Sequence, residues 1–534
     1  MSAVYRVLVA DQIALDGLAP LRDDARFEVI VKPGLKGNDL ADAIAEADAV
    51  LVRSATQITR ESLARANGLK VIGRAGVGVD TIDVDAATER GIAVLTAPAG
   101  NTISAAELTL ALTLALARRV PAADRSMKSG QWDRKSFSGT ELYGKTLGLV
   151  GAGRIGGEVA KRARAFGMQV IAFDPFLIAE RALALGIERV ELEEVLRRAD
   201  VVSLHVPLTD ATSGLLGDRE LALMKPTAVI INAARGGVVN EAALVRALEE
   251  KRLGGAALDV FEQEPLPADH PLRSLDNVVL TPHLGASTAE AQQNVAIEIA
   301  EAVRAALIDG DLARAVNAPG LGGDEMRRLR PLLDLAERLG ILASALAAGG
   351  LVRVEMRYAG ASANGLRLLT ATALCGALAR VVGGGAVNTV NALHVAAAHG
   401  IRVDQIHLDS RGVFAEQIEI RATTDAGETR VAGALLGEAH ARITGIDDFR
   451  VDMAPRGTLL VLRNQDVPGV IGRVGTVLGD AGINIAGYHQ SRLGAGGDAL
   501  AVVNVDGRVE ASVLQTLGAL SEIHSVRQVQ LDRS

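Results

Sequence analysis

The sequence is poor in cysteine and in aromatic residues. Its single cysteine, Cys375, excludes a disulfide within the chain, and such usage is typical of a reducing compartment. Cys375 lies inside an apolar helical pattern, so we expect a small core residue rather than a nucleophile. Aromatic residues make up 2% of the chain against 49% hydrophobic residues, which means that aliphatic side chains must build its cores.

Long apolar runs and basic stretches are also missing. No run reaches the roughly 18 residues of a membrane span. The opening MSAVYRVLVADQ lacks the basic and then apolar pattern of a secretory signal, so we expect a cytoplasmic protein. The net charge is −8 with no basic stripe, which argues against nucleic acid as a partner. We predict neither membrane association nor a metal site.

What the sequence does contain is a repeated alternation of strands and helices, typical of α/β folds with open parallel sheets. Its 534 residues, at roughly 150 per domain, suggest three or four domains. Short apolar runs alternate with helical patterns over residues 5–100, and a second, stronger series runs from Lys145 to about residue 284. Long helices are expected over 101–120, capped by an Asn or Thr, and over 287–307, which could return to the first series.

The C-terminal part has a different pattern. Glycine and proline around residues 315–325 indicate a linker. Residues 326–455 then mix helices with alternating strands such as VRVEMRYAG and contain no catalytic constellation. Beyond residue 456 the order strand, helix, strand, strand, helix, strand is that of a ferredoxin-like unit. Basic residues in the middle part would suit an anionic effector, and a solvated surface explains them equally well; they are Arg353, His440 and Arg450.

A glycine-rich turn, GAGRIG, lies between the strand LGLV and a helix. Gly151 permits the tight turn, Gly153 lets the backbone approach a pyrophosphate, and Gly156 lets the helix pack closely on the strand. The helix N-terminus adds N–H groups that bind phosphate. Asp174 ends the next strand, where a carboxylate binds the ribose hydroxyls and repels a 2′-phosphate. The pattern favours NAD over NADP, and the alternative is a turn without a ligand.

Three polar residues follow strands of the second series. Arg235 follows VIIN, Glu264 lies in LDVFEQEP, and His283 follows NVVLTP. Parallel sheets bind ligands outside the carboxyl ends of their strands, so we expect the three side chains to converge beside the dinucleotide.

These side chains suit hydride transfer at a hydroxyl-bearing carbon. A histidine accepts the hydroxyl proton at neutral pH, a neighbouring carboxylate orients the imidazole, and a guanidinium grips a substrate carboxylate through two hydrogen bonds. Taken singly, Arg235 could belong to a structural ion pair, Glu264 could be a solvated loop acid, and His283 could be a turn residue. Together they favour the functional interpretation, in which Arg235 has no carboxylate partner within the chain.

Four motifs resemble the D-isomer-specific 2-hydroxyacid dehydrogenase family in order and spacing: GKTLGLVGAGRIGGEVAKRARAFGMQVIAFDP, INAARGG, ALDVFEQEP and TPHLGAST. The whole chain resembles a long form of that family. The resemblance implies a Rossmann-type NAD domain inserted in a flavodoxin-like substrate domain, followed by an α+β intervening domain and a ferredoxin-like ACT domain. The implied ranges are 1–98 with 286–316 for the substrate domain, 99–285 for the NAD domain, 317–455 for the intervening domain and 456–534 for the ACT domain.

The same resemblance assigns roles to single residues. His283 would be the acid/base, Glu264 its partner and Arg235 the substrate-orienting cation. The cofactor would contact Gly151, Gly153, Arg154, Ile155, Gly156, Asp174, Thr209, Ala233, Asp259 and Gly285. The substrate would contact Arg53, Arg74 and Asn101, although the two arginines could instead form surface ion pairs. An effector would contact Asn464, Asp466 and Asn484.

The implied activity is NAD-dependent oxidation of 3-phosphoglycerate to 3-phosphohydroxypyruvate, the first step of the phosphorylated serine pathway, with serine as a possible effector. The resemblance also implies a homotetramer built from dimers, with Trp132 in the segment that reaches across a dimer and Arg134 or Lys135 meeting substrate phosphate there. The alternatives are another D-2-hydroxyacid dehydrogenase or, in a different class, an NAD(H)-sensing binding protein. The ACT domain could also serve dimerisation alone.

Overall fold

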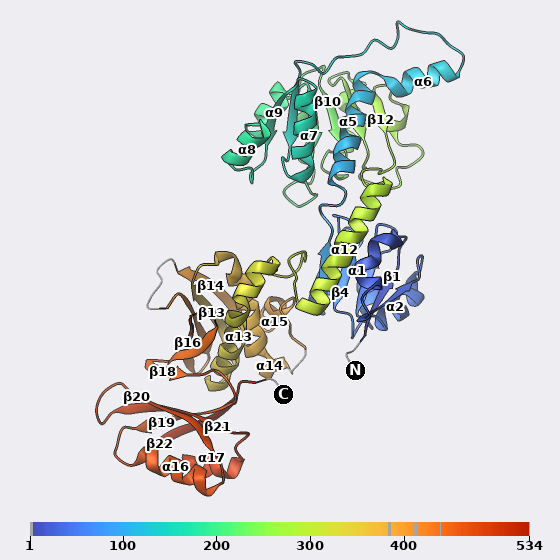
Figure 1. Ribbon diagram of the computed structural model, residues 1–534. Coiled ribbons are helices and arrows are strands. Elements are labelled where there is room, and N and C mark those ends of the chain that lie inside the picture. The colour runs from blue at the N-terminus through green and yellow to red at the C-terminus, as the bar shows by residue number, and fades with distance from the viewer. Residues whose placement is uncertain (1–3, 383–385, 409–413, 438, 533–534) are drawn as a thin grey trace.

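The computed structural model describes residues 4–382, 386–408, 414–437 and 439–532. Four sheets organise these residues, two of them parallel and in the N-terminal part of the chain. We call the unit around β1–β5 the first lobe and the unit around β6–β12 the second lobe. Figure 1 shows the lobes joined by the long helix α12, Ala289–Asp309. No helix in the described ranges is long and apolar enough to cross a membrane.

The first lobe is a parallel sheet in the order β2-β1-β3-β4-β5, which is the flavodoxin-like order that we expected. Strands β3 and β5 are buried on both faces, which explains their continuous apolar runs. Helix α12 returns to this sheet, as predicted, and buries Ile299 and Val303 against it. The elements are β1 Tyr5–Val9, α1 Ala19–Arg22, β2 Phe27–Val31, α2 Gly37–Ala45, β3 Ala49–Val52, α3 Arg60–Leu63, β4 Val71–Arg74, α4 Val84–Glu89 and β5 Ala93–Thr96.

The second lobe is a seven-stranded parallel sheet in the order β12-β11-β10-β9-β6-β7-β8. Its strand order reverses between β6 and β9, as in a Rossmann fold, and the glycine-rich turn lies at that reversal. The elements are β6 Thr146–Val150, α7 Arg154–Ala165, β7 Gln169–Phe173, α8 Ala179–Leu185, β8 Glu188–Arg189, α9 Leu192–Arg198, β9 Val201–Leu204, α10 Asp218–Leu221, β10 Val229–Asn232, α11 Glu241–Glu249, β11 Gly255–Leu258 and β12 Val278–Leu280.

The helix expected over 101–120 is shorter in the structure, where it forms α5, Thr102–Ala117. Arg119 takes a left-handed conformation (φ 54°), which breaks the helix before α6, Val120–Lys128. Asn101 occupies the N-cap position but donates and accepts no capping hydrogen bond through its side chain. The prediction of an Asn at the N-cap is therefore confirmed in position but not in bonding, and Asn101 Oδ1 is buried without a hydrogen-bond partner among the described residues.

The chain passes between the two lobes twice, once just before α5 and once through α12. One buried carboxylate joins these two connections. Glu298 of α12 accepts hydrogen bonds from the backbone N–H groups of Ala99 (3.0 Å) and Gly100 (2.8 Å), at the start of the other crossing. It also forms an ion pair with Arg314, which lies on the segment that leads to the C-terminal part. Glu298 therefore contacts both connections between the lobes and the segment that leads to the C-terminal part.

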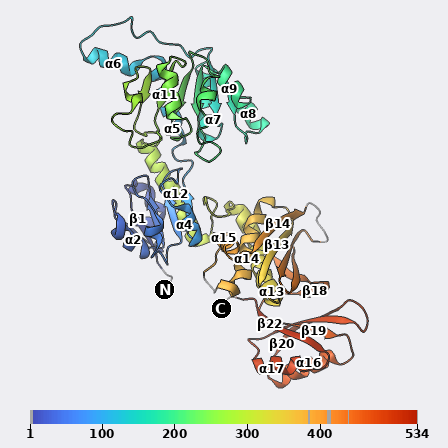
Figure 2. The same ribbon diagram turned by 180° about the vertical axis from the view of Figure 1, so that it is seen from behind.

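The middle part packs two helices and α15 against a six-stranded mixed sheet in the order β14-β13-β15-β16-β17-β18. Cys375 is buried in this core, as expected. Figure 2 shows α15 on the side nearest α4, and there Asn388 donates a hydrogen bond to the Gly91 carbonyl (2.8 Å). The elements are α13 Gly323–Leu346, β13 Leu351–Ala359, α14 Leu366–Val382, α15 Ala392–Ala398, β14 Arg402–Leu408, β15 Glu416–Thr424, β16 Gly427–Leu436, β17 His440–Ile446 and β18 Phe449–Met453.

The last unit has the predicted βαββαβ order and an antiparallel sheet arranged β20-β21-β19-β22. Strand β19 alternates between two cores. Leu460 and Leu462 face the unit's own helices, whereas Leu459 and Val461 pack into the core of the middle part. The two C-terminal units are therefore joined by a shared hydrophobic core. The elements are β19 Thr458–Gln465, α16 Val470–Asp480, β20 Ile485–Arg492, β21 Asp498–Val505, α17 Ala511–Gly518 and β22 Ile523–Gln530.

Two glycines, Gly340 and Gly376, allow α13 and α14 to pack closely. A Cβ added at Gly376 would lie 2.1 Å from the Glu337 carbonyl oxygen of the facing helix. Replacing Gly376 with Ala should therefore destabilise the middle part by about 1–3 kcal/mol through overpacking, as measured by thermal unfolding of the full chain.

Gly472 provides the matched control, because it lies in α16 with no atom within 4 Å of the added Cβ. Gly472→Ala should be neutral or stabilising by up to about 1 kcal/mol, because alanine is the better helix former. Equal melting behaviour of the two variants would contradict close helix packing at Gly376.

Candidate active site

The glycine-rich turn has the geometry that a dinucleotide requires. Gly151 has φ 94°, and a Cβ there would lie 2.6 Å from the His205 carbonyl oxygen. A Cβ on Gly156 would lie 2.3 Å from the Gly151 carbonyl oxygen, so only glycine lets α7 start this close to β6. Gly153 has no neighbouring atom within 4 Å of that position, which leaves its backbone open to a ligand. No side chain caps α7, so its first N–H groups can bind an anion.

Asp174 lies directly beside this turn, just after β7. Its carboxylate accepts hydrogen bonds from the backbone N–H groups of Ala152 and Phe176, both at 2.8 Å. These bonds fix the acid next to the place where a ribose would lie. The residues present therefore fit an NAD molecule.

His205, just after β9, lies beneath the same turn, and the sequence patterns did not identify it as a site residue. Its Nε2 is 2.9 Å from the Ser203 hydroxyl, and burial lowers the pKa of the imidazole to about 4. The ring is therefore neutral at physiological pH. No motif distinguishes this histidine in the sequence, because its significance depends on the turn folding over it.

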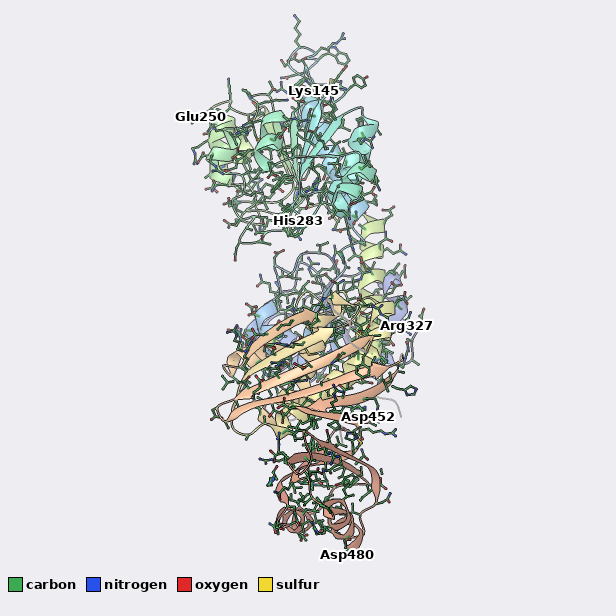
Figure 3. The ribbon with its side chains drawn as sticks, turned by 90° about the vertical axis from the view of Figure 1, so that its left-hand side faces the viewer. Lys145, Glu250, His283, Arg327, Asp452 and Asp480 are labelled. Atoms are coloured by element: carbon green, nitrogen blue, oxygen red, sulfur yellow. The ribbon has the colours of Figure 1, made fainter. Side chains whose placement is uncertain are left out.

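His283 and Glu264 form a hydrogen-bonded pair. Nδ1 of His283 lies 2.8 Å from Oε2 of Glu264, whose Oε1 accepts a hydrogen bond from the Phe261 N–H (3.1 Å). An ionised carboxylate only accepts hydrogen bonds, so Nδ1 carries the proton and Nε2 is left for a reacting group. Figure 3 shows His283 on the side of the second lobe that faces the first lobe. Both side chains line a recess of about 580 Å³.

The loop that carries His283 is held by the buried carboxylate of Asp259. That carboxylate accepts hydrogen bonds from the Thr281 hydroxyl (2.6 Å) and from the N–H groups of Leu284 (2.7 Å) and Gly285 (2.9 Å). His283 itself has φ 56°, a left-handed conformation that costs free energy for a non-glycine residue. The hydrogen bonds to Asp259 offset this cost, so Asp259 holds the loop in place. The resemblance also assigns Asp259 a contact with the cofactor.

Arg235 does have a carboxylate partner, contrary to our expectation. Its Nε lies 3.6 Å from Asp80 Oδ2, and its Nη1 donates to the Ala234 carbonyl (2.7 Å). Asp80 belongs to the first lobe, in the loop after β4, so its closeness to Arg235 could not be deduced from either segment alone. The turn beneath Arg235 is held by Asn232, whose side chain bonds the Arg235 carbonyl and the Ala234 N–H.

Two further arginines of the first lobe lie close to Arg235. Burial, together with the positive charges of Arg53 and Arg235, lowers the pKa of Arg74 to about 10. Arg74 Nε is buried and has no hydrogen-bond partner among the described residues. Arg53 is held through its backbone N–H by buried Asp11 (2.5 Å). Within the described residues, neither Arg53 nor Arg74 forms an ion pair, so the surface ion-pair alternative does not apply to them.

In the part of the chain that the structure describes, the other predicted residues form no hydrogen bond or ion pair with Arg235, Glu264 or His283. Arg154 begins α7 and is exposed, and Ile155 beside it is half-buried. Thr209 is on an exposed loop, where its hydroxyl pairs with that of Thr212 (3.0 Å). Ala233 is half-buried in the turn after β10, and Asn101 lies at the start of α5.

The three predicted effector residues are not brought together by hydrogen bonds. Asp466 pairs with Arg492 (3.0 Å), which lowers the pKa of the carboxyl group. Asn464 is buried and donates to the Gln465 carbonyl (2.8 Å), and Asn484 donates to Asp506 (2.8 Å). A ligand at this site would have to compete with those partners.

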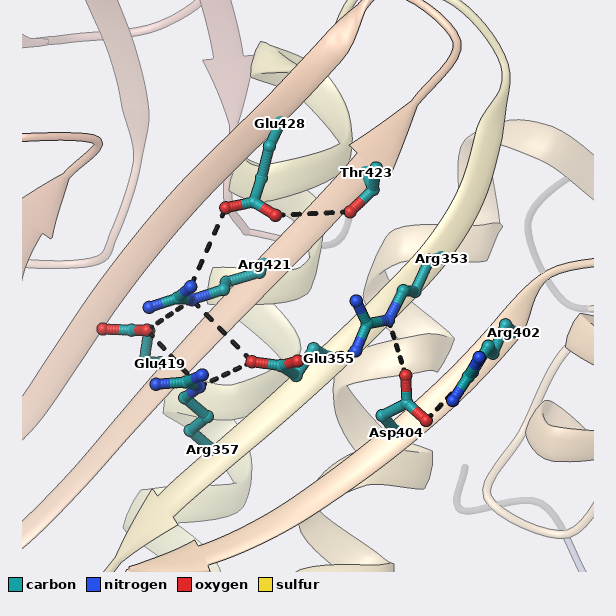
Figure 4. Close-up of polar contacts among 9 residues, drawn as sticks. All are labelled: Arg353, Glu355, Arg357, Arg402, Asp404, Glu419, Arg421, Thr423 and Glu428. Atoms are coloured by element: carbon teal, nitrogen blue, oxygen red, sulfur yellow. Dashed lines mark hydrogen bonds and ion pairs between the residues drawn. The ribbon is translucent and has the colours of Figure 1, made fainter.

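The charged face of the middle sheet is a network of paired groups. Figure 4 shows Glu355 among Arg353, Arg357 and Arg421, with Arg353 also bound to Asp404 (2.5 Å). Glu355 is buried, and three guanidinium groups surround its side chain and supply its polar partners. The ion pairs of Arg353 with Glu355 and Asp404 explain why an arginine lies here, so no anionic effector is needed to explain it.

Three family models match separate parts of the chain. They are the D-isomer specific 2-hydroxyacid dehydrogenase NAD binding domain over residues 110–285, the D-3-phosphoglycerate dehydrogenase intervening domain over 328–447, and the ACT domain over 458–522. The first of these contains both the glycine-rich turn and His283. The domain boundaries given above stay a prediction.

Full-length relatives give the same result. A D-3-phosphoglycerate dehydrogenase of Synechocystis sp. is 43% identical over 98% of this chain and 95% of its own length. One of Methanocaldococcus jannaschii is 42% identical over 99% and 100%. A crystal structure of a Thermus thermophilus protein is 41% identical, with a TM-score of 0.54, and covers 58% of this chain and 99% of its own. The chain therefore belongs to the D-3-phosphoglycerate dehydrogenase family, within the D-isomer-specific 2-hydroxyacid dehydrogenases.

Proposed function

We propose that this chain oxidises 3-phosphoglycerate to 3-phosphohydroxypyruvate with NAD, in the pathway that forms serine. The observation that carries the proposal is the His283–Glu264 pair, which faces a lobe that holds two arginines near Arg235. Relatives of this name match over nearly the full chain, and the two C-terminal domains match as well.

Arg53, Arg74 and Arg235 lie close together where the first lobe meets the second, and we call this region the cleft. Its charge suits the proposed substrate. A phosphorylated hydroxy acid carries a carboxylate and a phosphate, and Arg53, Arg74 and Arg235 together supply three positive charges. Buried Arg74 has an unused Nε donor, which is costly unless a ligand accepts its hydrogen bond. An unphosphorylated hydroxy acid would leave part of this charge unmatched.

The proton path follows from the hydrogen bonds. Nε2 of His283 accepts the proton of the 2-hydroxyl as the C2–H bond breaks and the carbonyl forms. Glu264 holds Nδ1–H and stabilises the imidazolium that results. Arg235 would hold the substrate carboxylate through its free N–H groups. NAD, when bound, supplies the acceptor for the hydride.

We propose serine as an effector of the ACT domain and a homo-oligomer as the assembly. Serine carries an ammonium group that could replace Arg492 at Asp466. For the assembly, the support is the segment after α6, which is almost entirely exposed and carries Trp132 at 78% exposure. Figure 1 shows α6 and this segment standing away from the second lobe.

The activity is tested by following NADH oxidation with 3-phosphohydroxypyruvate and with unphosphorylated hydroxypyruvate. We expect a clear preference for the phosphorylated substrate in kcat/KM. His283→Ala should lower kcat by about 10²–10⁴, because in this direction the imidazolium that donates a proton to the substrate's carbonyl oxygen is lost, while NADH binding, measured by fluorescence titration, stays intact. Near-normal turnover of this variant, or equal use of both substrates, would refute the assignment.

The effector proposal predicts a specific change in serine sensitivity. Serine should inhibit NADH oxidation by the native chain. Asp466→Asn should raise the half-inhibitory concentration at least about tenfold, since a charged partner for the ammonium group is lost. An enzyme that ignores serine would leave dimerisation as the role of the ACT domain.

The assembly proposal predicts that Trp132→Ser weakens subunit association, because a large exposed apolar side chain is removed from the contact. Sedimentation velocity over a range of concentrations should show a smaller species for this variant than for the native chain. Leu183→Ser is the matched control, since Leu183 is 83% exposed on α8 and does not belong to the segment after α6. If both variants sediment like the native protein, Trp132 is not an interface residue.

A further inference from the structure

One contact between the lobes has no role in the reaction as described above. Asp80 of the first lobe approaches Arg235 of the second lobe, with 3.6 Å between Oδ2 and Nε. Side-chain exposure is 68% for Asp80 and 26% for Arg235, so the acid reaches into the cleft from a solvated loop. The pair exists only while the lobes are this close, because its members belong to different sheets.

The surroundings of Arg235 restrict the plane of its guanidinium group. Nη1 donates to the Ala234 carbonyl on one side, and Nε faces Asp80 on the other. Nη2 packs directly on the backbone at Gly78, where an added Cβ would lie only 2.4 Å from it. Nη2 donates no hydrogen bond within the described residues and Nη1 donates one, so both retain N–H groups that can bind a carboxylate through parallel hydrogen bonds.

Asp80 also acts on the charge balance of the cleft. Arg53 and Arg235 both disfavour the charged form of Arg74, whereas Asp11 and Asp80 favour it. Asp11 is buried and already accepts hydrogen bonds from the backbone of Arg53 and from Thr56, so its position is fixed. Asp80 is therefore the exposed acid that offsets the repulsion at the Arg235 end of the cluster.

We propose that Asp80 is a positioning residue for the reaction, which acts across the cleft by holding the Arg235 fork in the orientation that binds the substrate carboxylate. This role rests on the proposed function. It requires no contact between Asp80 and the substrate. An exposed ion pair of this length contributes little to folding stability, so its removal should be visible in kinetics rather than in unfolding.

The test compares Asp80→Asn with Asp85→Asn in the full chain. Asp85 is an exposed acid in the first turn of α4, only five residues away, and no hydrogen bond or ion pair is formed by its side chain in the described structure. With 3-phosphohydroxypyruvate and NADH, Asp80→Asn should lower kcat/KM about tenfold, chiefly through KM, as expected when a carboxylate-binding group is misaligned. Asp85→Asn should stay within about twofold, and Asp80→Glu should recover part of the loss. NADH affinity should be unchanged in all three.

A double-mutant cycle then shows whether Asp80 acts through Arg235. In an Arg235→Lys background, where the fork is absent, Asp80→Asn should change kcat/KM by no more than about twofold, because coupled residues give non-additive effects. A tenfold loss in both backgrounds, or native kinetics for Asp80→Asn, would overturn the positioning role while leaving the proposed function intact. Inactivity of the native chain with this substrate would instead overturn the proposed function, and the role of Asp80 with it.

Discussion

The structure of the cleft depends on holding three like charges together. Arg53, Arg74 and Arg235 approach one another from two lobes, and burial with mutual repulsion lowers the pKa of Arg74 to about 10. Such a cluster of like charges is costly by itself, and two aspartates of the first lobe offset part of that cost. An anionic substrate would offset the rest. The positive charge of this cluster thus suits an acid that carries both a carboxylate and a phosphate, as the proposed substrate does.

The residues that we propose to react are held in place by other acidic residues. Asp259 uses a buried carboxylate to hold the loop in which His283 has a left-handed backbone, and Glu264 is itself held by the Phe261 N–H. Glu298 ties both crossings between the lobes, and it also contacts Arg314 on the outgoing linker. Buried carboxylates bonded to backbone N–H groups are effective anchors, because leaving such donors unpaired costs more than the bond itself contributes.

The C-terminal units are attached to this catalytic part through packing as well as through the linker. Val390 is buried in the core of the first lobe, and Asn388 bonds the Gly91 carbonyl. The ACT sheet shares a core with the middle part through Leu459 and Val461. A ligand that moved the ACT domain would therefore act on a continuous packed structure.

Much of this protein could be predicted from the sequence, because the signals were local. Strand-helix alternation, the glycines around Gly151 and the βαββαβ order each depend on short segments, and the resulting fold is the one expected. The positions of Glu264 and His283 at strand ends followed from the rule that parallel sheets bind ligands at their carboxyl edge, although their roles stay a prediction.

Contacts between distant segments could not be predicted from the sequence. No sequence pattern links Arg235 to Asp80, Asp259 to the loop that it holds, or Asp466 to Arg492. Nor does any pattern show that His205 is buried and neutral. Only the tertiary structure decided them, because ion pairs and buried hydrogen bonds depend on distance in space and not on spacing along the chain.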